Sequence, residues 1–229
     1  MTRVAIIAAL PGELQPLVRG WAPERRGAVR LWRRRRGDCE WIAACAGVGG
    51  AAAARALTEA GRDGDLQLIL SVGWAGALRA DLRAGQAHEV AGVVDAQSGE
   101  RFLTAAVSRG WWVTTSPAIA DHAMKRRLAA VTGAALVDME AAALARWAAA
   151  RRIPFRCIKA VSDGLDEALP DFNCFIGRDG QFQLARFVVF AAVRPSLWPG
   201  LVRIGRLSRQ AARALREAVL AALEDAPQS

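Results

Sequence analysis

Seven short apolar runs, each ended by turn-forming residues, alternate along this chain with segments of helical pattern. Runs of this kind predict buried strands. The predicted strands are residues 4–10, 41–46, 66–72, 87–94, 111–115, 135–137 and 155–161. The predicted helices are residues 49–59, 120–132, 139–151 and 201–223. Strands that alternate with helices favour an α/β fold with a central mixed sheet covered by helices on both faces.

The length and the apolar content fit one domain. The chain has 229 residues, of which 53% are hydrophobic, and no internal repeat or low-complexity linker interrupts it. We therefore expect a single domain over 1–229, with a core at about 3–171 and a C-terminal extension at about 186–229. The longest apolar run, 182–193, is interrupted by Arg186 and is shorter than the ~18 residues that a membrane span requires.

The net charge is +9, and nearly all basic residues are arginine, with lysine only at 125 and 159. This charge predicts attraction to anions such as phosphates, nucleic acid or acidic lipid headgroups. The four cysteines, Cys39, Cys45, Cys157 and Cys174, show no metal-binding or CxxC spacing. Cys45 and Cys157 lie in apolar, strand-like runs. The pattern predicts a reducing cytoplasm and no bound metal.

The arginines concentrate in two segments. Residues 25–36 carry seven arginines, and a period of two places Arg30 and Arg34 on one strand face, which favours a solvent-exposed hairpin. Residues 201–223 combine arginines with apolar residues at three- and four-residue spacing, which predicts a basic amphipathic helix. Two interpretations of this helix stay open: it covers the sheet, or part of it lies on an anionic membrane surface.

Two glycine-rich turns follow predicted strands. Residues 47–52 match the dinucleotide-binding pattern G-x-G-x-x-A, but the next strand lacks the acidic residue that this pattern needs. We instead expect a tight turn whose backbone N–H groups, including that of Gly49, face a pocket. In the second turn, Gly73 allows a ligand to approach the backbone, and Trp74 either walls the pocket or fills the core.

Acidic residues stand directly after three of the predicted strands. Glu13 follows the first strand, Asp138 and Glu140 the sixth, and Asp163 the seventh. Open α/β sheets bind ligands at the carboxyl ends of their strands, so these side chains are expected to converge. Taken singly, each has a structural explanation as a helix cap or a first-turn acid.

Together these residues suit the cleavage of an N-glycosidic bond in a purine nucleoside. Glu140 would bind two neighbouring sugar hydroxyls, Met139 would pack on the sugar, and Asp163 would donate a proton to the leaving base. Ser162 would hold Asp163 in place by a hydrogen bond.

The ordered set of motifs resembles the nucleoside phosphorylase superfamily, which includes purine nucleoside phosphorylases and methylthioadenosine/S-adenosylhomocysteine nucleosidases. The matching stretches are 4–10 with Glu13, 46–49, 72–76, 138–141 and 153–163. The resemblance implies that Asp163 protonates the purine at N7, that Glu140 binds the ribose, and that Glu13 orients an attacking water. It also implies a homo-oligomer such as a dimer.

The chain departs from this family at two places. Bacterial phosphorylases carry a phosphate-binding arginine and serine in the second glycine-rich turn, where this chain has Ser71 and Trp74. This favours water as the nucleophile, although an arginine elsewhere could restore inorganic phosphate as a co-substrate. The aromatic residue that nucleosidases place over the base has no counterpart in 115–118.

The C-terminal part resembles the hopanoid-associated branch of the family, which is linked to removal of adenine from adenosylhopane. The similar stretches are 169–172, 180–182, 186–187, 194–195 and 198–199. This resemblance implies a lipid-linked adenosine substrate, no cofactor, and a cytoplasmic protein that contacts the inner membrane face.

Two alternatives remain open. One is a soluble methylthioadenosine/S-adenosylhomocysteine nucleosidase or purine nucleoside phosphorylase. The other is a nucleoside- or nucleic-acid-binding module without catalysis. The joint presence of Glu13, Glu140 and Asp163 argues against a pure binder, and no RNA-binding motif with stacking aromatics accompanies the arginines, so no nucleic-acid partner is expected.

Overall fold

The computed structural model describes residues 1–106, 110–167, 172–177 and 179–224. Residues 169–171 of the turn named above therefore lie outside the described residues. The strands are β1 Thr2–Ala8, β2 Ala22–Arg26, β3 Val29–Arg36, β4 Cys39–Cys45, β5 Leu68–Ala77, β6 Ala87–Glu89, β7 Gly92–Asp95, β8 Arg101–Leu103, β9 Trp112–Thr115, β10 Leu136–Asp138 and β11 Phe155–Asp163. The helices are α1 Pro11–Leu14, α2 Gly50–Ala60, α3 His122–Thr132, α4 Ala141–Arg151, α5 Leu184–Ala192 and α6 Trp198–Glu224, with short 3-10 turns at Asn173–Phe175 and Pro195–Leu197.

Strand β5 is the centre of one mixed sheet. The strand order is β2-β3-β4-β1-β5-β10-β9-β7-β8, and β11 pairs with both β5 and β6. Strands β1, β4, β5 and β11 run parallel to one another, whereas β10 is antiparallel to β5. The carboxyl ends of the four parallel strands therefore meet at one edge of the sheet.

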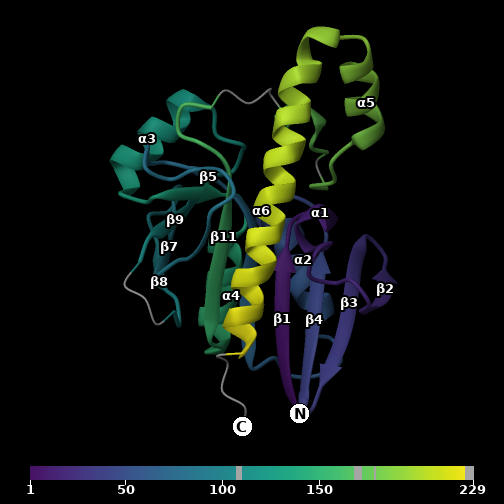
Figure 1. The fold of residues 1–229 in the computed structure, drawn as a ribbon. Coiled ribbons are helices and arrows are strands. Elements are labelled where there is room, and N and C mark those ends of the chain that lie inside the picture. Colours follow the sequence, from purple (N-terminus) through teal and green to yellow (C-terminus); the bar gives the residue numbers. More distant parts are fainter. Residues whose placement is uncertain (107–109, 168–171, 178, 225–229) are drawn as a thin grey trace.

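Helices cover both faces of this sheet, as the alternation of strands and helices predicted (Figure 1). Helices α2 and α4 pack on one face, where their alanines and leucines join the largest apolar core. Helix α6 covers the opposite face together with the segment around α1. Because both faces of the sheet are buried, the sequences of its central strands are nearly continuous runs of apolar residues.

The predicted strand at 87–94 is wrong as a single element. The chain instead forms β6, which pairs with β11, and β7, which pairs with β8 and β9. Between them the backbone changes partners, because the Val90 N–H donates to Cys157 and the Ala91 N–H donates to Trp111. A periodic sequence pattern does not reveal such a change, since both halves are extended and partly buried.

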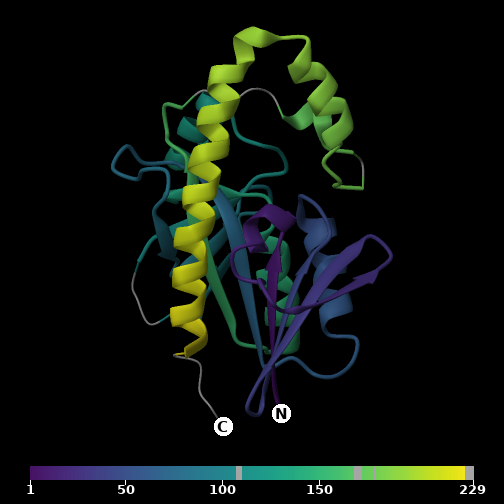
Figure 2. The same ribbon diagram turned by 45° about the vertical axis from the view of Figure 1, so that its right-hand side comes forward.

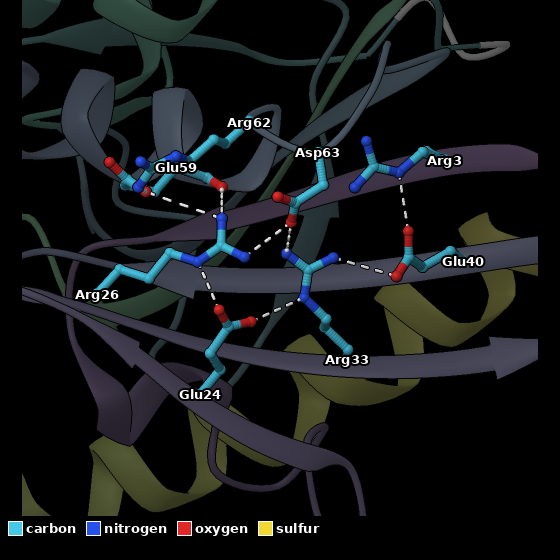
Figure 3. Close-up of polar contacts among 8 residues, drawn as sticks. All are labelled: Arg3, Glu24, Arg26, Arg33, Glu40, Glu59, Arg62 and Asp63. Carbon is cyan, nitrogen blue, oxygen red and sulfur yellow. Dashed lines mark hydrogen bonds and ion pairs between the residues drawn. The ribbon is translucent and has the colours of Figure 1, made fainter.

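The arginine-rich segment forms the expected hairpin, made of β2 and β3. Two of its arginines, Arg26 and Arg33, enter a network of ion pairs that ties the hairpin to the turn after α2 (Figure 3). Asp63 accepts a hydrogen bond from Arg26 at 2.8 Å and from Arg33 at 2.6 Å. Arg30 and Arg34 are exposed, as the hairpin interpretation expects.

Helix α6 has two halves in different surroundings. Its second half is buried against the sheet through apolar residues, namely Ala211, Ala212, Leu215, Val219, Ala222 and Leu223. Its first half extends past the sheet, with α5 alongside it (Figures 1 and 2). The second half therefore covers the sheet, as one of the two interpretations expects, whereas the first half extends beyond the sheet.

No single helix among the described residues is long and apolar enough to span a membrane. Helix α5 and the segment Pro195–Glu224, which are bent by 106° relative to each other, pass the length and composition criteria only when taken together.

Replacing Leu215 by alanine should lower the free energy of unfolding by about 2–5 kcal/mol, because Leu215 is buried between α6 and the sheet and its removal leaves a cavity. The matched control is Val202→Ala in the first half of α6, where the side chain is 70% exposed; its effect should stay within about 0.5 kcal/mol. Urea unfolding of the two variants measures both values. Equal destabilisation would contradict the division of α6.

Candidate functional site

A cavity of about 300 Å³ opens at the carboxyl ends of the parallel strands β1 and β11, next to the end of the antiparallel strand β10 and the second half of β5. This is the edge at which open α/β sheets bind ligands. The residues that line it include Leu10, Glu13, Val48, Trp74, Gly76, Ile119, Lys125, Asp138, Met139, Glu140, Ser162, Asp163, Phe172, Ile176, Phe182, Ile204 and Ser208. Most of the wall is apolar, and its polar side chains are Glu13, Glu140, Asp163, Lys125, Ser162 and Ser208.

Glu13 is held on the floor of the cavity by backbone N–H groups. Its Oε2 accepts from Ala9 at 2.9 Å and from Leu10 at 2.7 Å, and its Oε1 accepts from Trp74 at 2.7 Å. Burial raises the pKa of the Glu13 carboxyl, and the three backbone donors oppose that shift. A Cβ at Gly73 would lie 2.7 Å from Oε1, so only glycine at that position leaves room for the carboxylate.

Glu140 occupies the position just before α4 and reaches across to the glycine-rich turn after β4. Its Oε1 accepts from the Gly49 N–H at 2.7 Å. Gly49 has a φ of +92°, a conformation that glycine adopts without strain. Burial, together with the neighbouring Asp138, raises the pKa of Glu140 to about 8. The side chain is therefore poised to gain or lose a proton near neutral pH.

Asp138 is fully enclosed and supports its neighbour Glu140. Its Oδ1 accepts from Thr115 at 2.8 Å, and its Oδ2 accepts from the Ala141 N–H at 3.0 Å and pairs with Lys159 at 2.7 Å. Burial disfavours the Lys159 ammonium, but the nearby carboxylates outweigh burial and raise its pKa. Because no part of the Asp138 side chain is exposed, its place in the structure is beneath the site.

Asp163 stands at the end of β11, where the register against β5 shifts after Val161. A bulge of this kind redirects side chains. The Ser162 hydroxyl donates to Asp163 Oδ1 at 2.5 Å, as the sequence predicted. The opposite oxygen, Oδ2, pairs with Lys125 of α3, whose Nζ also donates to the Gly164 carbonyl at 2.7 Å.

The aromatic surface of the cavity comes from segments that are distant in sequence. Trp74 lies in the second half of β5, whereas Phe172 and Phe182 lie in the segment between β11 and α5. Residues 115–118 lack the aromatic side chain that nucleosidases place over the base. In this segment Thr115 donates a hydrogen bond to Asp138, and Ala118 lines the cavity. Helix α6 closes one side with Ile204 and Ser208.

The structure brings together most of the residues that the sequence singled out. Those that line the cavity are Glu13, Trp74, Asp138, Met139, Glu140, Ser162 and Asp163. Gly49 and Gly73 contact the carboxylates of Glu140 and Glu13 and are not among the wall residues.

Sequence reasoning missed the two lysines of the site. Lys125 and Lys159 are the only lysines in a chain whose other basic residues are arginines, and both are buried beside an acidic side chain of the site. Their isolation in an arginine-rich composition was the available signal. Lysine differs from arginine in that its ammonium can lose a proton when buried.

A comparison with protein-family models matches this chain to the phosphorylase superfamily over residues 3–88 and 88–186. The chain belongs to the phosphorylase superfamily. The membership confirms the resemblance seen in the sequence and makes the protein an enzyme that cleaves N-glycosidic bonds. None of the curated proteins matches the sequence significantly.

Solved structures with the same fold include several nucleosidases. The 5′-methylthioadenosine nucleosidase of Arabidopsis thaliana has a TM-score of 0.73 and 16% identity, covering 100% of this chain and 98% of that chain. The 5′-methylthioadenosine/S-adenosyl homocysteine nucleosidase of Helicobacter pylori has a TM-score of 0.73 and 14% identity, covering 98% of both chains. A futalosine hydrolase mutant of the same organism has a TM-score of 0.65 and 17% identity, covering 84% of this chain and 99% of that chain.

Replacing Glu140 by glutamine should stabilise the protein at alkaline pH but not at acidic pH. Between about pH 4.5 and about pH 8 the native state keeps a proton on Glu140 that the unfolded chain has lost, so wild-type stability falls as pH rises through this window. The variant lacks that loss and should be more stable above the window, on the order of 1–3 kcal/mol.

Urea unfolding of both proteins at a series of pH values measures this difference. Glu13 is present in both proteins, so the part of its raised pKa that comes from burial cancels when they are compared, and the part that comes from its interaction with Glu140 belongs to the measured difference. A stability difference that does not change with pH would contradict the raised pKa of Glu140.

Proposed function

We propose that this protein removes adenine from an adenosine derivative, and that water rather than phosphate attacks the sugar. The observation that carries the proposal is the convergence of Glu13, Glu140 and Asp163 on one cavity. In the mechanism that we propose, Glu140 holds the sugar, Glu13 activates the attacking water, and Asp163 assists the departure of the base as an acid. No step of this scheme requires a cofactor or a metal.

The three acidic residues lie at different parts of the cavity, and each position suits one of these roles. Glu140 and Met139 lie together at the start of α4, where the Glu140 carboxyl group can form hydrogen bonds with both ribose hydroxyls while the thioether packs on the sugar. Asp163 and Lys125 form a second polar group at the end of β11, which suits the purine. Glu13 lies on the floor, where its raised pKa suits a base that removes a proton from water.

The charges around the cavity support water as the nucleophile. The described lining residues include the acidic side chains of Glu13, Glu140 and Asp163 and no arginine, although the chain is rich in arginine. The only cation among them, Lys125, is already paired with Asp163. A phosphate dianion would therefore face carboxylates without a free cation to offset the repulsion.

Adenine release should be independent of phosphate, and Asp163→Asn should lower the turnover number by about 10²–10⁴-fold while substrate affinity changes little, because the acid assists the reaction only as the C–N bond breaks. The measurement is chromatography of adenine released from adenosine derivatives, with and without phosphate. Unchanged turnover in the variant would sink this mechanism, and a requirement for phosphate would replace hydrolysis by phosphorolysis.

The substrate that we favour carries a large apolar group at the 5′ position, such as the hopane of adenosylhopane. The cavity is walled by Phe172, Phe182 and Ile204 on the side of α5 and α6. Phe182 belongs to a cluster of aromatic rings with Phe175 and Phe187. A greasy 5′ substituent would find apolar partners along this side.

The same region offers a surface for an anionic membrane. Helix α5 and the start of α6 expose large apolar side chains, namely Leu184, Val188, Val189, Val193, Trp198 and Val202. Arg186, Arg194 and Arg206 are exposed among them. Exposed apolar residues flanked by arginines are typical of segments that insert shallowly between acidic headgroups. Peripheral contact at the cytoplasmic face of a membrane would bring the cavity to a lipid-linked nucleoside.

A soluble 5′-methylthioadenosine/S-adenosylhomocysteine nucleosidase is the second candidate, since nucleosidases of that kind share the fold over nearly the whole chain. The relative rates of adenine release from adenosylhopane and from methylthioadenosine separate the two candidates. The expected homo-oligomer stays a prediction, which light scattering would test.

Replacing Val189 by aspartate should weaken binding to vesicles that contain phosphatidylglycerol, because a charge on α5 opposes both insertion and the attraction of the arginines. The matched control is Val131→Asp on α3, an equally exposed valine on a different surface. Cosedimentation at low salt measures binding, and cleavage of a water-soluble nucleoside checks that both variants keep an intact site. Equal binding by the two variants would contradict the membrane surface.

A further inference from the structure

The β2–β3 hairpin carries arginines on both of its faces, and only one face is neutralised. Arg26 and Arg33 lie on the same face, because residues at a spacing of two share a face and Arg26 stands opposite Val29. Their acidic partners are Glu24, Glu40, Glu59 and Asp63 (Figure 3). On the other face, Arg25 and Arg30 are exposed, and the ion pairs of the described residues include neither of them.

Arg25 and Arg30 stand directly opposite each other in the hairpin. Like charges at directly opposite positions destabilise an antiparallel pair of strands. The Arg25 Nε donates to the Gly27 carbonyl at 3.0 Å, which keeps this side chain close to the tip of the hairpin. Since no acid among the described residues pairs with either arginine, an anion from outside the chain would relieve the repulsion.

The arginine pair lies at the edge of the sheet where the cavity opens. Arg30 is the partner of Cys45, which is the last residue of β4, and Val48 in the turn that follows lines the cavity. Strand β4 runs parallel to β1, β5 and β11. The tip of the hairpin therefore lies at the carboxyl ends of the parallel strands.

Helix α5 lies on the same side of the molecule as the hairpin (Figures 1 and 2). It exposes Leu184, Val188 and Val189, with Arg186 exposed among them. Apolar side chains that insert shallowly and a basic rim that approaches the headgroups are the two elements of peripheral binding to an acidic bilayer. Single-stranded nucleic acid binds instead through exposed aromatic rings, and Trp32 of β3 is partly buried against the core.

We propose that Arg25 and Arg30 form a second contact with an anionic membrane, so that a bilayer touches the protein both at α5 and at the tip of the hairpin. This assignment rests on the proposed function, in which α5 contacts the membrane. A single contact leaves the protein free to tilt on the bilayer, whereas two separate contacts fix its orientation. The edge of the sheet that carries the cavity then faces the lipid.

The test is Arg30→Glu, which should weaken membrane binding without weakening the fold. The carboxylate introduced at position 30 stands opposite Arg25 and forms a favourable cross-strand pair, so the melting temperature should stay equal or rise. One arginine near an acidic bilayer contributes a factor of about five to binding, so reversing its charge should lower the partition coefficient on phosphatidylglycerol vesicles at low salt on the order of tenfold.

The matched control is Arg127→Glu on α3, which makes the same change in net charge on an exposed arginine of a different surface. Its partition coefficient should fall by less than about twofold, because charges farther from the bilayer than the screening length contribute little. Equal binding by Arg30→Glu and Arg127→Glu would overturn the proposal. The contact of α5 would then stand alone, and Val189→Asp tests that contact separately.

A second arm measures binding to a short single-stranded RNA. Weaker RNA binding by Arg30→Glu, with vesicle binding unchanged, would assign the arginine pair to nucleic acid and overturn the proposal. Cleavage of a water-soluble nucleoside by Arg30→Glu should match the wild type, because Arg30 does not line the cavity. A wild-type protein that releases adenine from no nucleoside would refute the proposed function, whereas the vesicle measurement decides the role of the arginine pair.

Discussion

The burial of four acidic side chains at one edge of the sheet is the constraint on which the site depends. A buried carboxylate is tolerated only when hydrogen bonds or cations replace the water it has lost. Glu13 receives three backbone N–H groups, Glu140 receives one from Gly49, Asp138 is paired with Lys159, and Asp163 is paired with Lys125. The glycine-rich turn after β4 brings the Gly49 N–H to Glu140, and the glycine-rich segment predicted as a second turn is instead part of strand β5, where the Trp74 N–H reaches Glu13.

The two lysines pair with two acidic residues of the site, one beneath the cavity and one in its wall. Lys159 lies beneath the cavity and neutralises Asp138, which in turn fixes the start of α4 and so the place of Glu140. Lys125 lies in the cavity wall and pairs with Asp163. The chain's many arginines serve elsewhere, for example in the ion pairs that tie the β2–β3 hairpin to the turn after α2.

Helix α6 joins the fold to the mouth of the cavity. Its second half belongs to the apolar core. Its first half, which follows α5 in the chain, contributes Ile204 and Ser208 to the cavity wall. One helix therefore both stabilises the sheet and shapes the entrance. The family model matches the chain up to residue 186, whereas the fold shared with the nucleosidases extends over nearly the whole chain, including α6.

The sequence by itself determined the α/β class, most strands and helices, and the acidic residues of the site. These depend on local patterns, namely apolar runs, helical spacing and acids at strand ends, which a single segment displays on its own. Only the tertiary structure decided the division of 87–94 into β6 and β7, the burial of Asp138, and the pairing of Lys125 with Asp163 across 38 positions of the chain. Strand partners and buried ion pairs join segments that are far apart in sequence, so their energies arise only when the chain has brought those segments together.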